Sequence, residues 1–399
     1  MKYNTIIVGA GIVGLAVARE VARRRPDSRI AVIEKTDGVA SHQTGHNSGV
    51  IHGGIYYEPG SLKARLCVEG ARLLYEYCDE HAIPYDRCGK LIVAVREEQL
   101  GRLDELERRG RVNMVPHLRR LSAEEIKELE PNATGLQALH APNTGIVDYG
   151  RVSQAIADEL RGWGVDFHFG CLVERIDERG SEAVVVHKDG EFVADQVISC
   201  AGLWSDRLAR QSGAPADPRI VPFRGAYLGL KPREEPLIRR MIYPVPDPDL
   251  PFLGVHVTPS MSGRTMLGPT AMVALSREGY KLSRINPRDA WDIATWPGAW
   301  KVGQRFWRTA IEELRFAMSR RAFVEACAEY VPSLTVNDLD GTATAGVRAQ
   351  AVSRGGKLVD DFVIARIGPV LHVRNAPSPA ATSAFALARE IVEKAEVAA

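Results

Sequence analysis

The residues with the clearest chemical role form a glycine turn near the N-terminus. A short apolar run leads into Gly9, Gly11 and Gly14. In such a turn the first glycine permits the tight bend, the second lets a pyrophosphate approach the backbone, and the third lets helix and strand pack closely. Glu34 follows about twenty residues later, at the spacing of a carboxylate that binds ribose hydroxyls. The pattern predicts a dinucleotide-binding β-α-β unit whose helix N-terminus faces the phosphates.

Two later segments favour FAD over NAD as that dinucleotide. Residues 197–204 contain a buried apolar run that ends in the small-residue turn Ala201-Gly202, and such a strand would pack the nucleotide from its far side. Residues 370–383 are typical of a strand, a turn and the start of a helix, with Pro377 near its first turn. The positive end of that helix would face the N1–C2=O edge of a reduced flavin. A simple helix cap is the alternative interpretation.

The composition argues against several kinds of partner. Lys and Arg number 51 against 50 Asp and Glu, so the net charge is +1, whereas nucleic-acid-binding proteins usually carry a strongly basic face. The six cysteines include no C-x-x-C pair, which indicates reduced thiols and no zinc site. No apolar run reaches the roughly 18 residues of a membrane span, and no signal peptide is visible. We therefore expect a cytoplasmic protein without a metal or a nucleic-acid partner.

The helices and strands expected around these residues indicate an α/β fold class, α+β over the whole chain, with two domains. A Rossmann-like FAD-binding domain would be assembled from residues 1–88, 145–216 and 340–399. The inserts 89–144 and 217–339 would form a discontinuous, mostly antiparallel β substrate domain, because prolines there alternate with short strands. The substrate would bind between the two domains.

Motifs along nearly the whole chain resemble one flavoprotein family. Residues 42–57, with the sequence HQTGHNSGVIHGGIYY, resemble the flavin loop of the L-2-hydroxyglutarate oxidases and dehydrogenases of the D-amino-acid oxidase superfamily. Further matches lie at residues 60–64, 88–90, 222–225, 242–248, 251–256, 277–280, 345–351, 356–362 and 375–383. The resemblance implies an FAD-dependent oxidoreductase that acts on the CH–OH group of L-2-hydroxyglutarate, or a close L-2-hydroxy acid, and yields 2-oxoglutarate by hydride transfer to the flavin. The electrons would pass on to a quinone or to oxygen.

The glycine turn, the flavin loop, the buried strand and the C-terminal turn together give the expected contacts to FAD. These residues are Gly9, Gly11, Gly14, Glu34, Ser41, Thr44, His46, Asn47, Ser48, Gly49, Ala201, Gly202, Pro377, Ser378, Ala380 and Thr382. Two positions depart from the family pattern: Ala226 stands where the family has glutamate, and Leu228 where it has an aromatic residue. A carboxylate is therefore missing beside an expected active-site strand, which leaves the exact acid open.

The reaction requires a base for the hydroxyl proton and cations for the substrate carboxylates. Histidine is the simplest base near pH 7, and His256 and His52 are the candidates, although either ring could instead be a structural hydrogen-bonding group. A dicarboxylate calls for guanidinium groups, which bind carboxylates through two parallel hydrogen bonds. Arg348 is the first candidate because small residues flank it, and Arg224 is the second.

Other interpretations stay open. Residues 291–321 are rich in tryptophan and arginine, which suits a helix on a membrane surface and would bring the enzyme to a quinone at the inner face of the cell membrane. The same segment equally suits a helix packed on its own domain. The other functions considered are a flavin-dependent amine or amino-acid oxidase of the glycine-oxidase type and a non-catalytic FAD-binding protein.

Overall fold

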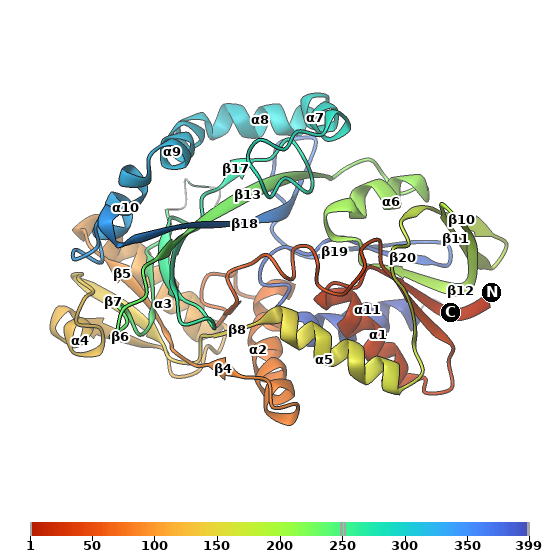
Figure 1. Ribbon diagram of the computed structural model, residues 1–399, viewed down its shortest axis with the longest axis horizontal. Coiled ribbons are helices and arrows are strands. Elements are labelled where there is room, and N and C mark those ends of the chain that lie inside the picture. The colour runs from red at the N-terminus through yellow and green to blue at the C-terminus, as the bar shows by residue number, and fades with distance from the viewer. Residues whose placement is uncertain (1, 248–249, 251–252, 397–399) are drawn as a thin grey trace.

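Two large β-sheets, each covered by helices, build the molecule (Figure 1). The computed structural model describes residues 2–247, 250 and 253–396, so Pro248, Pro251 and Phe252 of the family motifs lie outside the described residues. Among the described helices none combines the length and the apolar character needed to cross a membrane.

The first sheet has the strand order β10-β11-β12-β1-β2-β9, and β20 pairs with β12 and with β19. Its central strands pair in parallel and are apolar and buried, as expected for strands covered on both faces. The strands are β1 (Lys2–Val8), β2 (Ile30–Ile33), β9 (Asp166–His168), β10 (Val173–Arg179), β11 (Glu182–His187), β12 (Gly190–Ser199), β19 (Val363–Ile367) and β20 (Val370–Asn375). The helices α1 (Ile12–Arg24), α2 (Leu62–Glu80), α5 (Tyr149–Gly162), α6 (Ser205–Gln211) and α11 (Ala384–Glu396) accompany it.

The core of this half lies between the sheet and four of its helices. Apolar residues of α1, α2, α5 and α11 recur at helical spacing and join the buried residues of β1 and β2 in one cluster. Helix α6 packs on β10 and β20, where a separate apolar cluster lies. The sheet therefore has helices on both faces, and the predicted Rossmann-like fold class is confirmed.

The second sheet has the order β17-β13-β16-β15-β14-β5-β7-β6, and β18 pairs with β13. Its pairs are antiparallel except for β14 with β5. The strands are β5 (Lys90–Ala94), β6 (Arg119–Ser122), β7 (Gln137–Ala141), β13 (Arg219–Leu230), β14 (Met241–Pro244), β15 (His256–Pro259), β16 (Thr265–Gly268), β17 (Met272–Val273) and β18 (Leu339–Val352). Its helices are α3 (Leu100–Val112), α4 (Ala123–Leu129), α7 (Pro287–Ala294), α8 (Pro297–Arg305), α9 (Trp307–Met318) and α10 (Arg320–Ala328).

Smaller elements connect the halves. A three-stranded sheet is formed by β3 (Val50–Ile51), β8 (Gly145–Val147) and β4 (Tyr85–Asp86), and short 3-10 helices are η1 (Glu97–Gln99), η2 (Gly202–Trp204) and η3 (Val336–Asp338). Residues 340–352, which we placed in the FAD-binding domain, pair along β18 with β13 and so belong to the second sheet. The other domain boundaries stay predictions.

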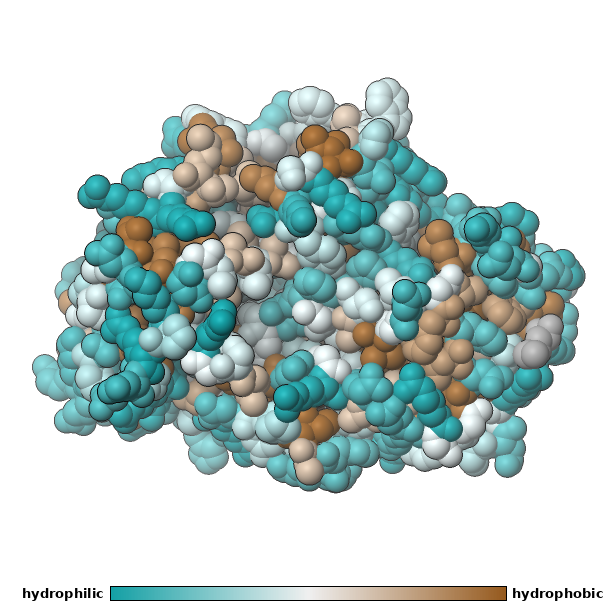
Figure 2. Space-filling model, viewed as in Figure 1, coloured by the Kyte–Doolittle hydropathy of each residue, from teal (hydrophilic) through white to brown (hydrophobic). Residues whose placement is uncertain are grey.

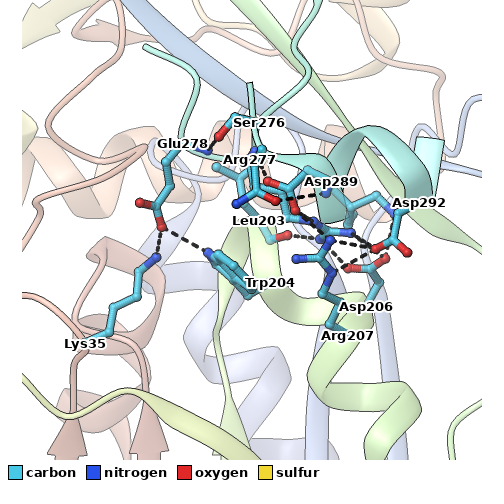
Figure 3. Close-up of polar contacts among 12 residues, drawn as sticks. Lys35, Leu203, Trp204, Asp206, Arg207, Ser276, Arg277, Glu278, Asp289 and Asp292 are labelled. Carbon is cyan, nitrogen blue, oxygen red and sulfur yellow. Dashed lines mark hydrogen bonds and ion pairs between the residues drawn. The ribbon is translucent and has the colours of Figure 1, made fainter. Parts of the chain in front are cut away.

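Buried ion pairs join the two halves near η2 (Figure 3). Arg277, which follows β17 and is 2% exposed, donates from Nη1 to Asp206 of α6 at 2.5 Å. Its backbone N–H donates to the Asp289 side chain of α7 at 2.7 Å, and Asp289 also accepts from Arg207 of α6 at 2.6 Å. Asp206 further accepts from the backbone N–H of Ile220 at 3.1 Å, next to the start of the second sheet. The cluster thus ties α6 of the first half to α7, β13 and the segment after β17.

Replacing Arg277 with methionine should destabilise the fold strongly. The change leaves Asp206 and Asp289 buried with part of their pairing lost, and breaking a buried pair from one side costs about 3–5 kcal/mol. The free energy of unfolding in urea measures the loss. Arg321→Met, on the exposed face of α10, is the matched control and should change it by less than about 0.5 kcal/mol. Equal values for the two variants would contradict this role for the cluster.

Candidate cofactor and substrate site

A cavity of about 900 Å³ runs from the glycine turn of the first sheet to the second sheet. Gly9, Gly11 and Gly14 line one end, and His256 and Arg348 line the other. Its size suits a cofactor together with a small substrate, since such sites are usually concave and several hundred Å³ in volume.

The glycine turn is packed so closely that side chains would not fit. Gly9 has φ of 107°, and a Cβ built there would lie 2.6 Å from the backbone oxygen of Cys200. A Cβ on Gly14 would lie 2.0 Å from the backbone oxygen of Gly9. Glu34 accepts the backbone N–H of Ala10 at 2.9 Å, which holds its carboxylate beside the turn. These residues fit the diphosphate and ribose of a dinucleotide.

The flavin loop, residues 42–57, lies across the N-terminus of α1. Thr44 Oγ1 accepts the backbone N–H of Ile12 at 3.1 Å, and Asn47 Nδ2 donates to the Thr44 carbonyl at 2.6 Å. The His46 ring stacks on Tyr280 with ring centres 4.2 Å apart. Tyr280 belongs to the segment that the buried ion cluster holds, so the cluster also positions this loop.

The C-terminal turn packs against the same loop at His52. The backbone N–H of His52 donates to Thr382 Oγ1 at 3.1 Å, and Thr382 also hydrogen-bonds the Tyr149 hydroxyl at 3.1 Å. The His52 Nε2 lies 3.3 Å from Ser378 Oγ, whereas its Nδ1 is buried and has no hydrogen-bond partner among the described residues. The two ends of the chain therefore converge on one wall of the cavity, which supports the FAD interpretation.

The structure brings most of the predicted cofactor residues to the cavity. Its lining includes Gly9, Gly11, Gly14, Glu34, Ser41, Thr44, His46, Asn47, Ser48, Ala201, Gly202, Pro377, Ser378, Ala380 and Thr382. Gly49 is not in the lining; it has φ of 69° and its N–H donates to Asn47 Oδ1 at 2.7 Å, so it shapes the loop instead.

His256, at the start of β15, is buried and lines the cavity. Its Nδ1 lies 2.9 Å from the Gly254 carbonyl, which can only accept, so Nδ1 carries the proton and Nε2 has a free lone pair in the neutral ring. Burial is the main cause that lowers the pKa of His256 to about 3; the positive charges of Lys90 and Arg348 contribute to this shift, and the bond to Gly254 opposes it. Burial and nearby cations also hold the pKa of His52 well below its usual range. Both rings are therefore neutral at pH 7.

Arg348 reaches the cavity from β18. The Tyr227 hydroxyl of β13 lies close to the side chains of Arg348 and Ser48, so the guanidinium is beside the flavin loop. Arg224 is not in the cavity lining: its Nε donates to the Tyr280 carbonyl at 3.0 Å. The structure thus gives Arg224 a position that braces the segment over the flavin loop.

Sequence reasoning missed three residues of the substrate end. Lys90 of β5 lies behind Tyr243, and Tyr56 lines the cavity with a buried hydroxyl that has no partner among the described residues. Glu313 of α9 accepts the backbone N–H of Ala271 at 2.6 Å, close enough to Arg348 for that charge to oppose the rise that burial causes in its pKa. Tyr56 and Lys90 lie within the family-like segments 42–57 and 88–90, but no local pattern gives any of the three residues its role, because elements distant in the chain bring them together. In the part of the chain that the structure describes, no group of His, Cys, Asp and Glu side chains could hold a metal ion.

Comparisons with known proteins agree with this geometry. A family model described as FAD dependent oxidoreductase (DAO) matches residues 4–394. Mitochondrial L-2-hydroxyglutarate dehydrogenase from Nematostella vectensis is 48% identical, over 98% of this chain and 90% of its own. The L-2-hydroxyglutarate dehydrogenase from Indibacter alkaliphilus is 42% identical over 98% of both chains.

Solved structures share the fold at lower identity. L-α-glycerophosphate oxidase from Mycoplasma pneumoniae with FAD bound superimposes with a TM-score of 0.80 at 24% identity, covering 99% of this chain and 95% of its own. Glycine oxidase from Geobacillus kaustophilus gives a TM-score of 0.72 at 18% identity, over 99% and 95% of the two chains. Both similarities support the fold, but a shared fold does not identify the substrate, which depends on the residues of the site.

Proposed function

This chain belongs to the family of FAD-dependent oxidoreductases, and from that premise we propose that it oxidises L-2-hydroxyglutarate to 2-oxoglutarate. One observation supports the substrate above all: relatives named L-2-hydroxyglutarate dehydrogenases match the chain at 40–48% identity over nearly its full length. FAD, when bound, accepts the α-hydrogen of the hydroxy acid as a hydride. The chain supplies binding, a base and electrostatics.

In this proposal the first half holds the cofactor. The turn at Gly9, Gly11 and Gly14 and the N-terminus of α1 would bind the diphosphate, and Glu34 would bind a ribose. The flavin loop and the C-terminal turn, which meet at His52, would hold the isoalloxazine at the boundary with the second sheet.

His256 is the proposed base. The fixed tautomer presents Nε2 as an acceptor for the proton of the substrate hydroxyl. A pKa of about 3 is too low for an efficient base at pH 7; burial lowers this pKa most, and the cations Lys90 and Arg348 add to the shift. Two substrate carboxylates would oppose those charges and move the pKa of His256 upward, towards the working range. His52, which contacts the C-terminal turn, fits a role in holding the cofactor.

Arg348 is the proposed carboxylate clamp. It lines the cavity beside Tyr227, and Lys63 lines the same cavity while paired with Asp360 at 2.7 Å. With Lys90 behind Tyr243, the cations of this end suit a dianion better than the zwitterion that an amine oxidase binds. This balance favours a hydroxy diacid over glycine.

A substrate panel tests the function. L-2-hydroxyglutarate, D-2-hydroxyglutarate, glycine and sarcosine are offered to the FAD-loaded enzyme with an artificial dye as electron acceptor. We expect turnover with L-2-hydroxyglutarate and at most traces with the other three. Preferred turnover of glycine or sarcosine would replace the proposal with an amine oxidase, and no turnover with any of them would favour a non-catalytic FAD protein.

Substitutions at the two site residues should have separable effects. His256→Ala should slow flavin reduction at saturating substrate by about 100-fold or more, because general base catalysis is lost. Arg348→Ala should raise KM by about 10- to 100-fold, since a charged hydrogen-bonding group is removed. Both variants should keep the yellow absorbance of bound FAD, and Arg321→Met on α10 serves as the control. Unchanged kinetics in either variant would remove that residue from the proposed site.

The second part of the proposal concerns the face formed by α7–α9. We infer that this face contacts a membrane surface, where the electrons would reach a quinone. Figure 2 shows apolar side chains among hydrophilic ones along this edge. No residue of α9 is buried, and Trp307, Ile311 and Met318 are exposed beside arginines of the same helix. Aromatic and basic side chains together favour an interface with anionic lipid.

Vesicle sedimentation tests the membrane contact. The enzyme should sediment with phosphatidylglycerol vesicles at low salt and much less with phosphatidylcholine, because the arginines require an anionic surface. The double variant Trp307→Ser with Ile311→Ser should stay in the supernatant. Met114→Ser, an exposed apolar position two residues beyond the end of α3, is the control. If the double variant sediments as well as the control does, α9 is not the contact.

A further inference from the structure

Lys90, the first residue of β5, is a buried lysine behind the cavity wall. It is 1% exposed and does not line the cavity. The strands run β5-β14-β15, with Lys90 opposite Met241 and Ile242 opposite Val257. Since side chains alternate between the faces of a strand, Lys90, Tyr243 and His256 lie in a row on one face of the sheet.

The contacts along this row are close. Lys90 Nζ lies 4.0 Å from the centre of the Tyr243 ring and 5.3 Å from that of Tyr56. The His256 imidazole stacks on Tyr243 with ring centres 3.7 Å apart and an angle of 21° between the planes. The imidazole fills one face of the Tyr243 ring, so the ammonium must occupy the other. A cation, an aromatic ring and the proposed base are thus held in one stack.

Among the described residues Lys90 has no carboxylate partner. In the described chain no Asp or Glu oxygen lies within 4.0 Å of its Nζ, whereas Lys63, also buried, pairs with Asp360. The titratable groups that face Lys90 are Tyr56 and His52 of the flavin loop, Cys67 of α2, Cys88 before β5, Tyr243 of β14 and His256 of β15. Burial raises the pKa of the Cys67 and Cys88 thiols to about 12 and those of the tyrosines above their ordinary value, so none of these groups is an anion at neutral pH.

A buried ammonium without an anion is unstable relative to the neutral amine. Burial accordingly lowers the pKa of Lys90 to about 7. A dianion in the adjacent cavity would supply the missing negative charge and favour the protonated form.

We propose that Lys90 is a positioning residue that takes up a proton from solvent when a dicarboxylate enters the cavity, so that binding of the substrate charges the group behind Tyr243. The proton adds to the Nζ lone pair and is distinct from the hydroxyl proton, which goes to His256. The choice of a dicarboxylate rests on the proposed function. The uptake itself rests on the row of side chains and the unpaired lysine.

Calorimetric titration with glutarate tests the proposal, because glutarate has two carboxylates but no hydroxyl to oxidise. Titrations of the FAD-loaded enzyme in phosphate and in Tris, which differ in ionisation enthalpy, give the number of protons taken up per ligand. A group with a pKa of about 7 predicts uptake of up to about half a proton at pH 7 and close to one at pH 8. Because binding raises the pKa of Lys90, affinity should be highest below pH 7 and fall as the pH rises above it.

Matched variants identify the group. Lys90→Arg keeps a permanent charge and should bind glutarate without proton uptake and without the fall in affinity above pH 7. Lys90→Met removes the charge and should bind more weakly, also without uptake. Lys127→Met, on the exposed face of α4, should behave as the parent enzyme does. The flavin absorbance of each variant shows whether the fold and the cofactor site are intact.

The outcomes separate this inference from the proposed function. No proton uptake by the parent enzyme, or full uptake by Lys90→Arg, overturns the inference while oxidation of L-2-hydroxyglutarate persists. If neither glutarate nor 2-oxoglutarate binds, the inference is also overturned. If L-2-hydroxyglutarate is then not oxidised either, the proposed function fails with it.

Discussion

The buried ion pair between Arg277 and Asp206 is the interaction on which the rest of the structure depends. It fixes the segment after β17 against α6, and the cavity lies between the two sheets that this contact joins. The same segment carries Glu278, which pairs with Lys35 beside the dinucleotide turn (Figure 3). It also carries Tyr280, which stacks on His46 of the flavin loop. Buried pairs often contribute little net stability compared with apolar packing, so the value of this cluster lies in the positions it imposes.

One physical cause explains the unusual acid–base properties of the substrate end. His52, His256 and Lys90 are all removed from water, and burial lowers the pKa of each. For His52 and His256 the nearby cations act in the same direction as burial and also favour the neutral ring. An end of the cavity built in this way gains most from an anionic ligand, which agrees with the substrate of the curated relatives.

The parts of the site that depend on local structure could be predicted from the sequence. The glycine turn and Glu34 could be predicted because strand, turn and helix follow one another directly in the chain. The position of Arg224 could not be predicted in the same way. An arginine suits a carboxylate clamp, but only the bond from Arg224 to the Tyr280 carbonyl shows that it braces the segment over the flavin loop. Residues 340–352, predicted to lie in the FAD-binding domain, form most of β18, one long strand that pairs with β13 of the second sheet, and this long-range pairing leaves no local signal in the sequence.

Lys90 lies in the family-like segment 88–90, but its role could not be predicted from the sequence, because that role depends on the order β5-β14-β15, which brings together residues more than a hundred positions apart. The account as a whole is tested most directly by anaerobic stopped-flow reduction of the bound flavin by L-2-hydroxyglutarate with hydrogen or deuterium at C2. It predicts rapid loss of the oxidised flavin absorbance and a large primary isotope effect on that rate, since the C2–H bond breaks as the hydride leaves. A flavin that stays oxidised, or one reduced without any isotope effect under conditions where chemistry limits the rate, would contradict it.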